Sequence, residues 1–314
     1  MNMNKKIATR QSYGEALANL GEKNENIVVL DADLSNATKT GLFAKKFPNR
    51  FVDVGISEQN MMGIAAGLST FGKVAYASTF AVFAAGRSYD QIRNSIAYPK
   101  MNVKICATHA GITVGEDGAT HQMIEDISLM RTLPNMKVMC CSDDAQTRWA
   151  VEEISKIDGP VYLRLCRLAT PVIYDENQKF EFGKGVQIGE GKDGTIFATG
   201  VTVAEAIKAK EILKEQGIDV RVVDIHTIKP IDEELIIKCA KETKKIVTVE
   251  DHNIIGGLGS AVCEVLSTNY PKMVTRLGIK DTFGCSGKAT ELMKFFEIDA
   301  DAIVKEFTKS GNVY

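Results

Sequence analysis

Short β-rich runs alternate with helical patterns along nearly the whole of this 314-residue chain, and that alternation limits the fold more than any other feature. Parallel strands need a crossover connection of about a dozen residues or more, which is usually a helix. Repeated strand–helix units therefore predict an α/β protein, in which each mostly parallel sheet is flanked by helices. The strands expected in the first part are 26–33, 73–78, 102–109, 136–141 and 160–165. The helices expected there are 11–20, 58–70, 80–98, 123–132 and 143–157.

A glycine-rich segment, IGEGKDGT at 188–195, interrupts this alternation with three glycines and few apolar residues. Such a segment is typical of a linker, so it predicts two domains, covering residues 1–187 and 195–314. Beyond it the pattern of strands and helices resumes. The strands expected there are 195–200, 219–225, 244–251 and 273–279, and the helices are 202–217, 233–243 and one beginning at Leu258.

Composition narrows the class of protein. The chain is 45% hydrophobic and 25% charged, as in soluble globular proteins. A net charge of −2 argues against nucleic acid or a membrane as a partner, and no apolar run is long enough to span a bilayer. The first residues lack the apolar core of a signal peptide. Seven cysteines without regular spacing suit reduced thiols, so we expect a cytoplasmic protein.

The segment DVGISEQNMMGIAAGL, residues 53–68, sets one acid, Glu58, among glycines and apolar residues that are typical of packed interior. A carboxylate that loses its water must be paired, or the group must hold a proton. Glu58 also begins an expected helix, where the helix dipole would stabilise an acid that has no functional role. These residues alone leave the alternatives open.

A second candidate lies in THAGITVGEDGATHQ, residues 108–122, which holds two of the four histidines of the chain, His109 and His121. His109 closes an expected strand, and open α/β sheets bind ligands at the carboxyl ends of their strands. Glycines let the backbone approach a ligand closely, and Asp117 and His121 can then exchange hydrogen bonds or protons with it. The histidine spacing fits no usual zinc site, and a solvated loop is the plain alternative.

Two further pairs of residues are candidates by position. Phe80 and Phe83 are three residues apart on an expected helix, which indicates either packed core or a flat wall for a heterocyclic ring. Arg10 precedes the first expected helix, and Arg167 follows the last strand of the first part. An arginine at such an end suits bidentate binding of a phosphate, although each one alone is usually a surface charge.

These segments, in this order, resemble the C-terminal part of transketolases. The resemblance is carried by DVGISEQNMMGIAAGL, STFAVF, THAGITVGEDGATHQ with IEDISLMRTLPNMKV, and later TIKPID and EDHNIIGGLGSAV. It begins at ATRQSYGEAL and covers nearly the whole chain. In that family these segments form the domain that binds the pyrimidine ring of thiamine diphosphate, followed by a C-terminal domain.

The resemblance implies how the chain would bind its cofactor. Glu58 matches the glutamate that hydrogen-bonds the aminopyrimidine ring, and a protonated carboxyl group there would activate the cofactor for attack on a ketose carbonyl. Phe83 matches the aromatic ring that stacks on the pyrimidine, with Phe80 beside it. Asp33, in the segment DADLSN, resembles an acid near the cofactor.

The resemblance also implies how the chain would bind sugar phosphates. Asp117 and His121 match residues that hold the hydroxyl groups and the reacting centre of the donor sugar. Arg10, His109 and Arg167 match the group that binds its phosphate. We therefore expect transfer of a two-carbon ketol unit from a ketose phosphate to an aldose phosphate.

Some features depart from the family pattern. Gly86 stands where tyrosine is common, Ala119 replaces a proline, and the serine that helps bind phosphate is either Ser35 or absent. The Gly-Asp-Gly motif that holds Mg²⁺ and diphosphate on a separate N-terminal domain is missing. The resemblance therefore implies one subunit of a split enzyme, with no metal ligand in this chain. A transketolase N-terminal-section subunit would supply the Mg²⁺ site, in an α2β2 heterotetramer.

Three alternatives remain. A deoxyxylulose phosphate synthase shares parts of the Glu58 segment and of the loop, but it usually carries aspartate at the position of His109. The beta chain of a pyruvate-type dehydrogenase has a similar length but lacks the GEDGATHQ loop. A non-catalytic regulatory homologue would not need to keep Glu58, both loop histidines and both arginines, all of which are present.

Overall fold

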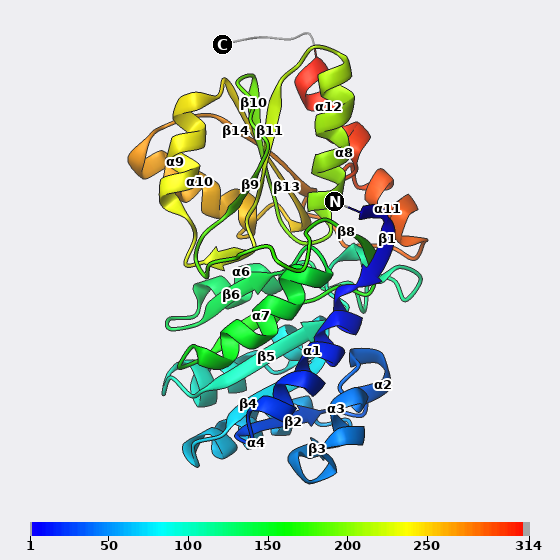
Figure 1. The fold of residues 1–314 in the computed structure, drawn as a ribbon, viewed down its shortest axis with the longest axis vertical. Coiled ribbons are helices and arrows are strands. Elements are labelled where there is room, and N and C mark those ends of the chain that lie inside the picture. Colours follow the sequence, from blue (N-terminus) through cyan, green and yellow to red (C-terminus); the bar gives the residue numbers. More distant parts are fainter. Residues whose placement is uncertain (1, 310–314) are drawn as a thin grey trace.

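The computed structural model describes residues 2–309 and contains two domains, each built on a mostly parallel sheet with helices on both faces (Figure 1). The predicted α/β fold with two domains is therefore confirmed. Within the described residues, no helix has the length and apolar character that crossing a bilayer requires.

The first sheet has seven strands in the order β12-β6-β7-β5-β4-β2-β3. Six of them come from the first part of the chain and are parallel: β2 (Ile27–Asp31), β3 (Phe51–Asp53), β4 (Val74–Phe80), β5 (Val103–Thr108), β6 (Lys137–Cys140) and β7 (Val161–Arg164). Side chains of successive residues point to opposite faces of a strand. In β2, Val28 and Leu30 accordingly enter one core cluster, whereas Ile27 and Val29 enter the cluster on the other face.

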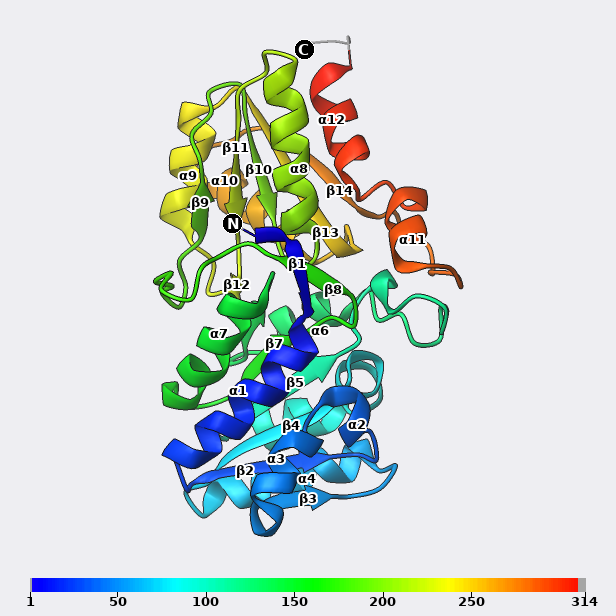
Figure 2. The ribbon, with the colours of Figure 1, turned by 45° about the vertical axis from the view of Figure 1, so that its right-hand side comes forward.

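Helices cover both faces of this sheet (Figure 2). On one face α1 packs against both α3 and α7, and on the other α4 lies with α5, α6 and two π-helical turns. The helices of this part are α1 (Thr9–Lys23), α2 (Ser35–Thr38), α3 (Gly41–Lys46), α4 (Glu58–Thr70), α5 (Tyr89–Gln91), α6 (Asp126–Thr132) and α7 (Asp144–Lys156). The shorter turns are η1 (Pro48–Arg50), the π-helical η2 (Val82–Arg87) and η3 (Ile92–Ala97), and the 3₁₀ turn η4 (Ile112–Val114).

The second sheet has five strands in the order β14-β13-β10-β11-β9, of which only β9 is antiparallel to its neighbour. These strands are β9 (Val186–Ile188), β10 (Gly194–Ala198), β11 (Val220–Asp224), β13 (Lys245–Asn253) and β14 (Val274–Ile279). The helices are α8 (Thr202–Glu215), α9 (Glu233–Glu242), α10 (Leu258–Asn269), α11 (Ala289–Phe295) and α12 (Ala300–Thr308). Helices α8 and α12 pack together on one side of the sheet, and α9 and α10 pack on the other (Figure 2).

The two domains share structure at their junction. β12 (Thr227–Lys229) belongs by sequence to the second part, yet it pairs antiparallel with β6 at the edge of the first sheet. Near the N-terminus β1 (Asn2–Ala8) pairs with β8 (Ala169–Val172) in a two-stranded ribbon. The division at residues 187 and 195 remains a prediction, and β9 lies at that division with its hydrogen bonds directed to β11.

The prediction of one continuous helix at 80–98 is wrong in its start and in its helix type. Phe80 is the last residue of β4, because the ladder to β5 continues until Phe80 lies opposite Thr108. The chain then forms the π-helical turns η2 and η3 around the short α5. Phe80 and Phe83 therefore do not share one helix, although their side chains meet.

Candidate functional site

Several predicted site residues meet at one edge of the first sheet. Because β2, β4, β5 and β7 are parallel, their carboxyl ends lie at the same edge. Phe80 ends β4, His109 directly follows β5, and Arg167 comes shortly after β7. This edge is the place where open α/β sheets bind ligands.

Glu58 is the first residue of α4, and its side chain is only 3% exposed. Its Oε2 accepts a hydrogen bond from Nη1 of Arg87 at 2.8 Å. Arg87 ends the π-helical turn η2, and its side chain is 46% exposed. The acid among apolar residues thus has a charge partner, which is one of the alternatives that the sequence allowed. A protonated Glu58 acting on a cofactor remains a prediction.

A row of flat groups leads from this ion pair into the site. The guanidinium of Arg87 lies over the ring of Phe83, 4.4 Å from its centroid. The rings of Phe83 and Phe80 are stacked with centroids 5.9 Å apart, and Phe80 stacks on the imidazole of His109 at 3.8 Å. The ring of His121 meets Phe83 edge-on at 5.7 Å. The two rings therefore connect the Glu58–Arg87 ion pair with His109 and His121, and their role as a wall for a heterocyclic ring remains a prediction.

His109 is buried and has a left-handed backbone with φ of 56°. Its Nδ1 lies 2.9 Å from Oγ1 of Thr108, and its Nε2 lies 3.2 Å from Nη1 of Arg10. Burial, with the charges of Arg10 and Arg167 nearby, lowers the pKa of His109 to about 3. The imidazole is neutral near pH 7, so Nε2 accepts from the arginine and Nδ1–H donates to the threonine.

Arg10 carries a charge that no acid in the described part of the chain neutralises through an ion pair. Its Nη1 donates to the backbone carbonyl of Ala37 at 3.0 Å and to His109, and its Nε is buried without a partner. Burial lowers the pKa of Arg10, and the positive charge of Arg167 lowers it further. Two arginines close together with an unsatisfied donor form a site that suits an anion such as phosphate.

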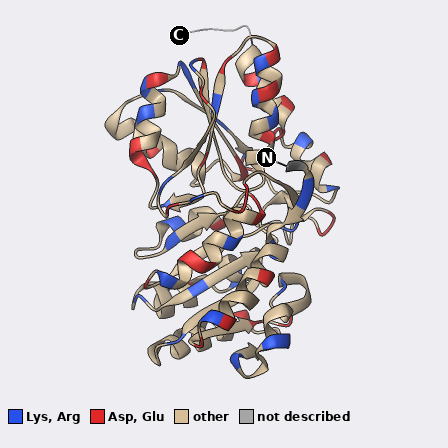
Figure 3. Cartoon of the chain, viewed as in Figure 1, with Lys and Arg blue, Asp and Glu red and all other residues tan. Residues whose placement is uncertain are grey.

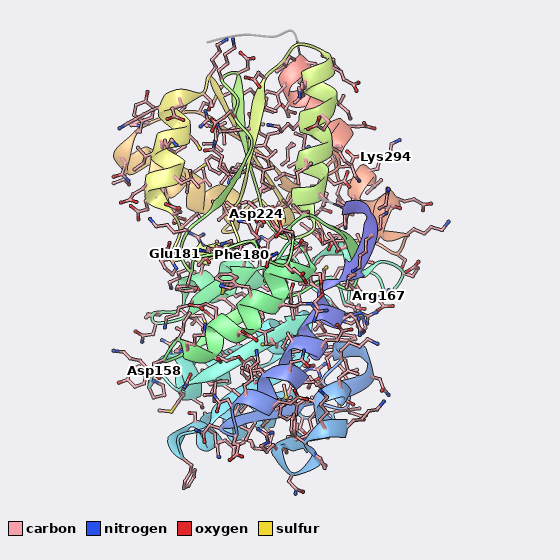
Figure 4. The ribbon with its side chains drawn as sticks, in the orientation of Figure 1. Asp158, Arg167, Phe180, Glu181, Asp224 and Lys294 are labelled. Carbon is pink, nitrogen blue, oxygen red and sulfur yellow. The ribbon has the colours of Figure 1, made fainter. Side chains whose placement is uncertain are left out.

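The predicted loop residues lie at the same edge. Arg167 donates to the carbonyl of Val114 at 2.5 Å and lies 3.5 Å from Glu116 and 4.0 Å from Asp117. It is near the level at which the two domains meet (Figure 4). Asp117 is exposed, and His121 is half-buried with Nδ1 at 2.9 Å from Oγ1 of Thr120. The structure thus brings these side chains together around Arg167 and the two phenylalanine rings.

Asp33 is exposed just beyond β2, with a φ of 61° and its backbone N–H donating to Asp53 at 3.0 Å. The buried acid of this segment is Asp31, whose carboxylate accepts hydrogen bonds from Thr38, Thr40 and the backbone of Leu34. Burial raises the pKa of Asp31 to about 6. Asp31 therefore shapes the chain after β2, while the assignment of Asp33 to the cofactor remains a prediction.

Three residues that contact Glu58 or the loop at 111–122 were missed from the sequence: Arg87, Gln122 and Asp251. For Arg87 a signal existed, since it follows Phe83 by one helical turn and the same region needed a partner for Glu58. Gln122 and Asp251 both lie in segments that carry the family resemblance, THAGITVGEDGATHQ and EDHNIIGGLGSAV, but no local signal predicts their contacts with the other domain.

A cavity of about 1070 Å³ lies elsewhere, between α1, α7 and the segment 174–180, and none of the predicted site residues lines it. Its wall mixes acids and bases, among them Lys23, Glu152 and Arg148, which already form ion pairs. The functional candidates instead occupy a partly exposed edge of the sheet, where Asp33, Asp117 and Arg87 all reach solvent.

Comparison with known protein families gives two matches in succession. The transketolase pyrimidine-binding domain matches residues 5–172, and the transketolase C-terminal domain matches residues 183–303. The chain is 55% identical over 299 residues to a Methanocaldococcus jannaschii protein described as a transketolase C-terminal section, with 94% of each chain covered. It is 42% identical over 304 residues to rat transketolase, covering 96% of this chain and 48% of the rat protein. The chain thus spans about half the length of that relative.

A solved structure of a split-gene transketolase, described as an inactive β4 tetramer, superposes with a TM-score of 0.91. The two chains are 53% identical, and the match covers 97% of this chain and 98% of the other. Both domains and their relative placement are therefore shared with that protein.

Proposed function

The chain belongs to the transketolase family, and from that premise we propose that it is the C-terminal-section subunit of a split, thiamine diphosphate-dependent transketolase. It transfers a two-carbon ketol unit from a ketose phosphate to an aldose phosphate. The observation that carries the proposal is the continuous row of groups from Glu58 through Phe83 and Phe80 to His109 and Arg10. This row joins a buried acid to an anion site across a flat wall.

The residues present fit the aminopyrimidine ring of the cofactor. In this chain the guanidinium of Arg87 donates an N–H to Glu58 and lies over the ring of Phe83. An aminopyrimidine ring at this place would meet the same two side chains, stacking on Phe83 and accepting a hydrogen bond from a protonated Glu58, so Arg87 marks a place that such a ring can occupy. When bound, thiamine diphosphate supplies the carbanion chemistry of the reaction. Glu58 would hold a proton at the ring nitrogen, and Phe83 with Phe80 would orient the ring.

The anion site would hold the sugar phosphate. Arg10 and Arg167 supply charged N–H donors, which bind phosphate oxygens more strongly than neutral donors do. His109 uses both ring nitrogens on Thr108 and Arg10, so it would act on the phosphate by holding Arg10 in place. Asp117 and His121, on the exposed part of the loop, would bind the sugar hydroxyl groups. Asp33 would complete the cofactor site at the exposed end of β2.

The surface of α4 supports a role for a second polypeptide. Gly63 and Gly67 are exposed on this helix one turn apart, and a Cβ built on either meets no atom within 4 Å beyond its chain neighbours and the nearby backbone of its own helix. Ile56 is 76% exposed before the helix, and Phe71 is 84% exposed after it. A helix surface with two exposed glycines, flanked by exposed apolar residues, suits close packing against another chain. Lys and Arg are mixed with Asp and Glu over both domains (Figure 3). This even distribution gives no reason to expect a strongly charged partner.

We assign this face to assembly with an N-terminal-section subunit that carries the Mg²⁺–diphosphate site, in an α2β2 heterotetramer. The relative solved as a β4 tetramer is described as inactive, which supports the need for a second kind of chain. The test is to purify this chain with and without an N-terminal-section transketolase chain, and to add thiamine diphosphate and Mg²⁺. Two-carbon transfer should require both chains. Turnover by this chain alone, or preference for pyruvate with glyceraldehyde phosphate, would overturn the proposal.

A further inference from the structure

The C-terminal domain contacts the loop at 111–122, hereafter the substrate loop, through one buried carboxylate. Asp251 lies on β13 and is 2% exposed. Its Oδ1 accepts from the backbone N–H of Ile112 at 2.8 Å, and its Oδ2 accepts from Oγ1 of Thr113 at 2.8 Å and from the N–H of Thr113 at 3.4 Å. One side chain of the second domain thus accepts from the first two backbone N–H groups of η4, the first turn of the loop, and from the hydroxyl of Thr113.

The loop is shaped to receive this carboxylate. Gly111 has a φ of 78°, and a Cβ at that position would lie 2.1 Å from Oδ2 of Asp251. A glycine is needed there both for the backbone conformation and for the close approach. On the other side, the main-chain carbonyl of Asp251 accepts from Nη2 of Arg164 at 2.8 Å. Asp251 is therefore held in place by the first domain while it holds the loop.

A second set of contacts fastens the far part of the loop to the segment 284–286 of the C-terminal domain. The Nε2 of Gln122 lies within 3.1 Å of the carbonyl of Gly115 and within 2.9 Å of that of Cys285. Oγ of Ser286 donates to the carbonyl of Glu116 at 2.9 Å. The backbone between η4 and His121 is thus tied to the C-terminal domain directly at Glu116 and through Gln122 at Gly115. That domain contributes none of the predicted substrate ligands.

We infer that Asp251 is a positioning residue through which the C-terminal domain holds the substrate loop in its binding shape. The path to the substrate is short, because η4 ends at Val114, whose carbonyl accepts from Arg167, and Asp117 and His121 follow on the same loop. This inference rests on the proposed function for the identity of the ligand. It gives the C-terminal domain a role in binding the sugar phosphate.

The neighbouring residue provides a matched control. Glu250 lies on the same strand, is also fully buried, and accepts from the backbone N–H groups of Leu258 and Gly259 at 2.6 and 2.8 Å. Its hydrogen bonds stay within the C-terminal domain. Asp251→Asn and Glu250→Gln each replace one buried carboxylate oxygen by an amide, so both should lower the melting temperature. Only Asp251→Asn weakens hydrogen bonds to the substrate loop.

The experiment uses the complex with the N-terminal-section chain. Asp251→Asn should raise the KM for the ketose phosphate by about tenfold with a smaller change in kcat, since the lost interaction involves a charged acceptor. Glu250→Gln should leave the KM near that of the wild type. Hydrogen exchange of the amides at 112–121 should accelerate in Asp251→Asn and not in Glu250→Gln. Equal changes in the two variants, or unchanged KM and exchange in Asp251→Asn, would overturn the inference.

Ser286→Ala keeps the test decisive should Asp251→Asn fail to fold, because Ser286 is exposed and its hydroxyl donates only to the loop carbonyl. It should raise the KM by about twofold and accelerate exchange at 115–118, as expected for the loss of one neutral hydrogen bond. No change in either quantity would contradict the inference. The exchange measurement needs no turnover, so it separates failure of this inference from failure of the proposed reaction, which wild-type activity reports.

Discussion

Arg87 and Glu58 form an ion pair between a half-exposed cation and a buried acid, with Nη1 2.8 Å from Oε2. The two partners differ in how far their side chains are exposed to solvent. Glu58 is fixed at the start of α4 among packed residues, whereas the side chain of Arg87 keeps 46% of its surface in solvent and has a route away from the acid. We therefore expect that a ligand binding to Glu58 displaces Arg87 and leaves the carboxyl group where it is.

Replacing Arg87 by methionine should separate its effect on stability from its effect on cofactor binding. Without its partner the buried carboxylate is less stable, and the free energy of unfolding should fall by about 1–3 kcal/mol, less than for a fully buried pair because Arg87 is half-exposed. The affinity of the complex for thiamine diphosphate should rise, since no guanidinium has to leave. Thermal unfolding and calorimetric titration measure the two effects. Arg93→Met is the control, because Arg93 is exposed and, among the described residues, its side chain bonds to the neighbouring Asn94 alone. Weaker cofactor binding by Arg87→Met would show that Arg87 helps to hold the cofactor.

Replacing Glu58 by glutamine should abolish most activity. The amide keeps the shape of the side chain but cannot exchange a proton with a ring nitrogen, and general acid–base catalysis contributes about 100-fold or more. Two-carbon transfer by the complex should drop by at least that factor, while gel filtration shows intact assembly. Glu22→Gln, which removes an exposed acid paired with Lys46, should keep wild-type activity. Activity of Glu58→Gln near that of the wild type would exclude an acid–base role for this residue.

The buried acid Asp224, which lies between the two domains (Figure 4), should make stability depend on pH. Burial raises its pKa to about 7, although Ser142, Tyr174 and Gln146 donate to its Oδ2. The folded state then holds a proton that the unfolded chain releases near pH 4. The stabilisation from this proton is complete below pH 4 and is lost as pH rises from about 4 to about 7.

Asp224→Asn removes this dependence, because an amide does not ionise. Relative to the wild type, the variant should gain a few kcal/mol in free energy of unfolding between about pH 4 and about pH 7, because the pKa of Asp224 is about 7 in the folded chain and about 4 in the unfolded chain. Urea unfolding at a series of pH values measures the difference. Parallel curves for the two proteins would mean that Asp224 is ionised in the folded state throughout this range.

A leucine at Gly63 should block assembly without harming the chain itself. A Cβ at this position meets no atom within 4 Å beyond its chain neighbours and the nearby backbone of its own helix. Leucine favours a helix over glycine by about 1 kcal/mol, so the isolated chain should melt slightly higher. Sedimentation with the N-terminal-section chain should show loss of the heterotetramer. Lys214→Leu, on the distant helix α8, should assemble normally. Unimpaired assembly of Gly63→Leu would place the interface elsewhere.

Local patterns determined much of this protein. Continuous apolar runs predicted β2, β4, β5, β6 and β7 close to their observed bounds, and α4 begins at Glu58 as expected. These signals are local, because a buried parallel strand and an amphipathic helix each leave their own periodicity in neighbouring residues. The residue types at strand ends likewise predicted a site at His109, Arg167 and the loop, which the structure places at one edge of the first sheet.

Tertiary structure decided the end of β4, the pairing of β12 and the partners of single side chains, because these depend on contacts between residues far apart in the chain. The ladder to β5 extended β4 through Phe80, and the pairing of β12 with β6 joined the second part of the chain to the first sheet. Glu58 found its partner 29 residues away, and Asp251 reaches the substrate loop across 139 residues. A single side chain carries no periodic signal, so its partner is set only when the sheets and helices pack.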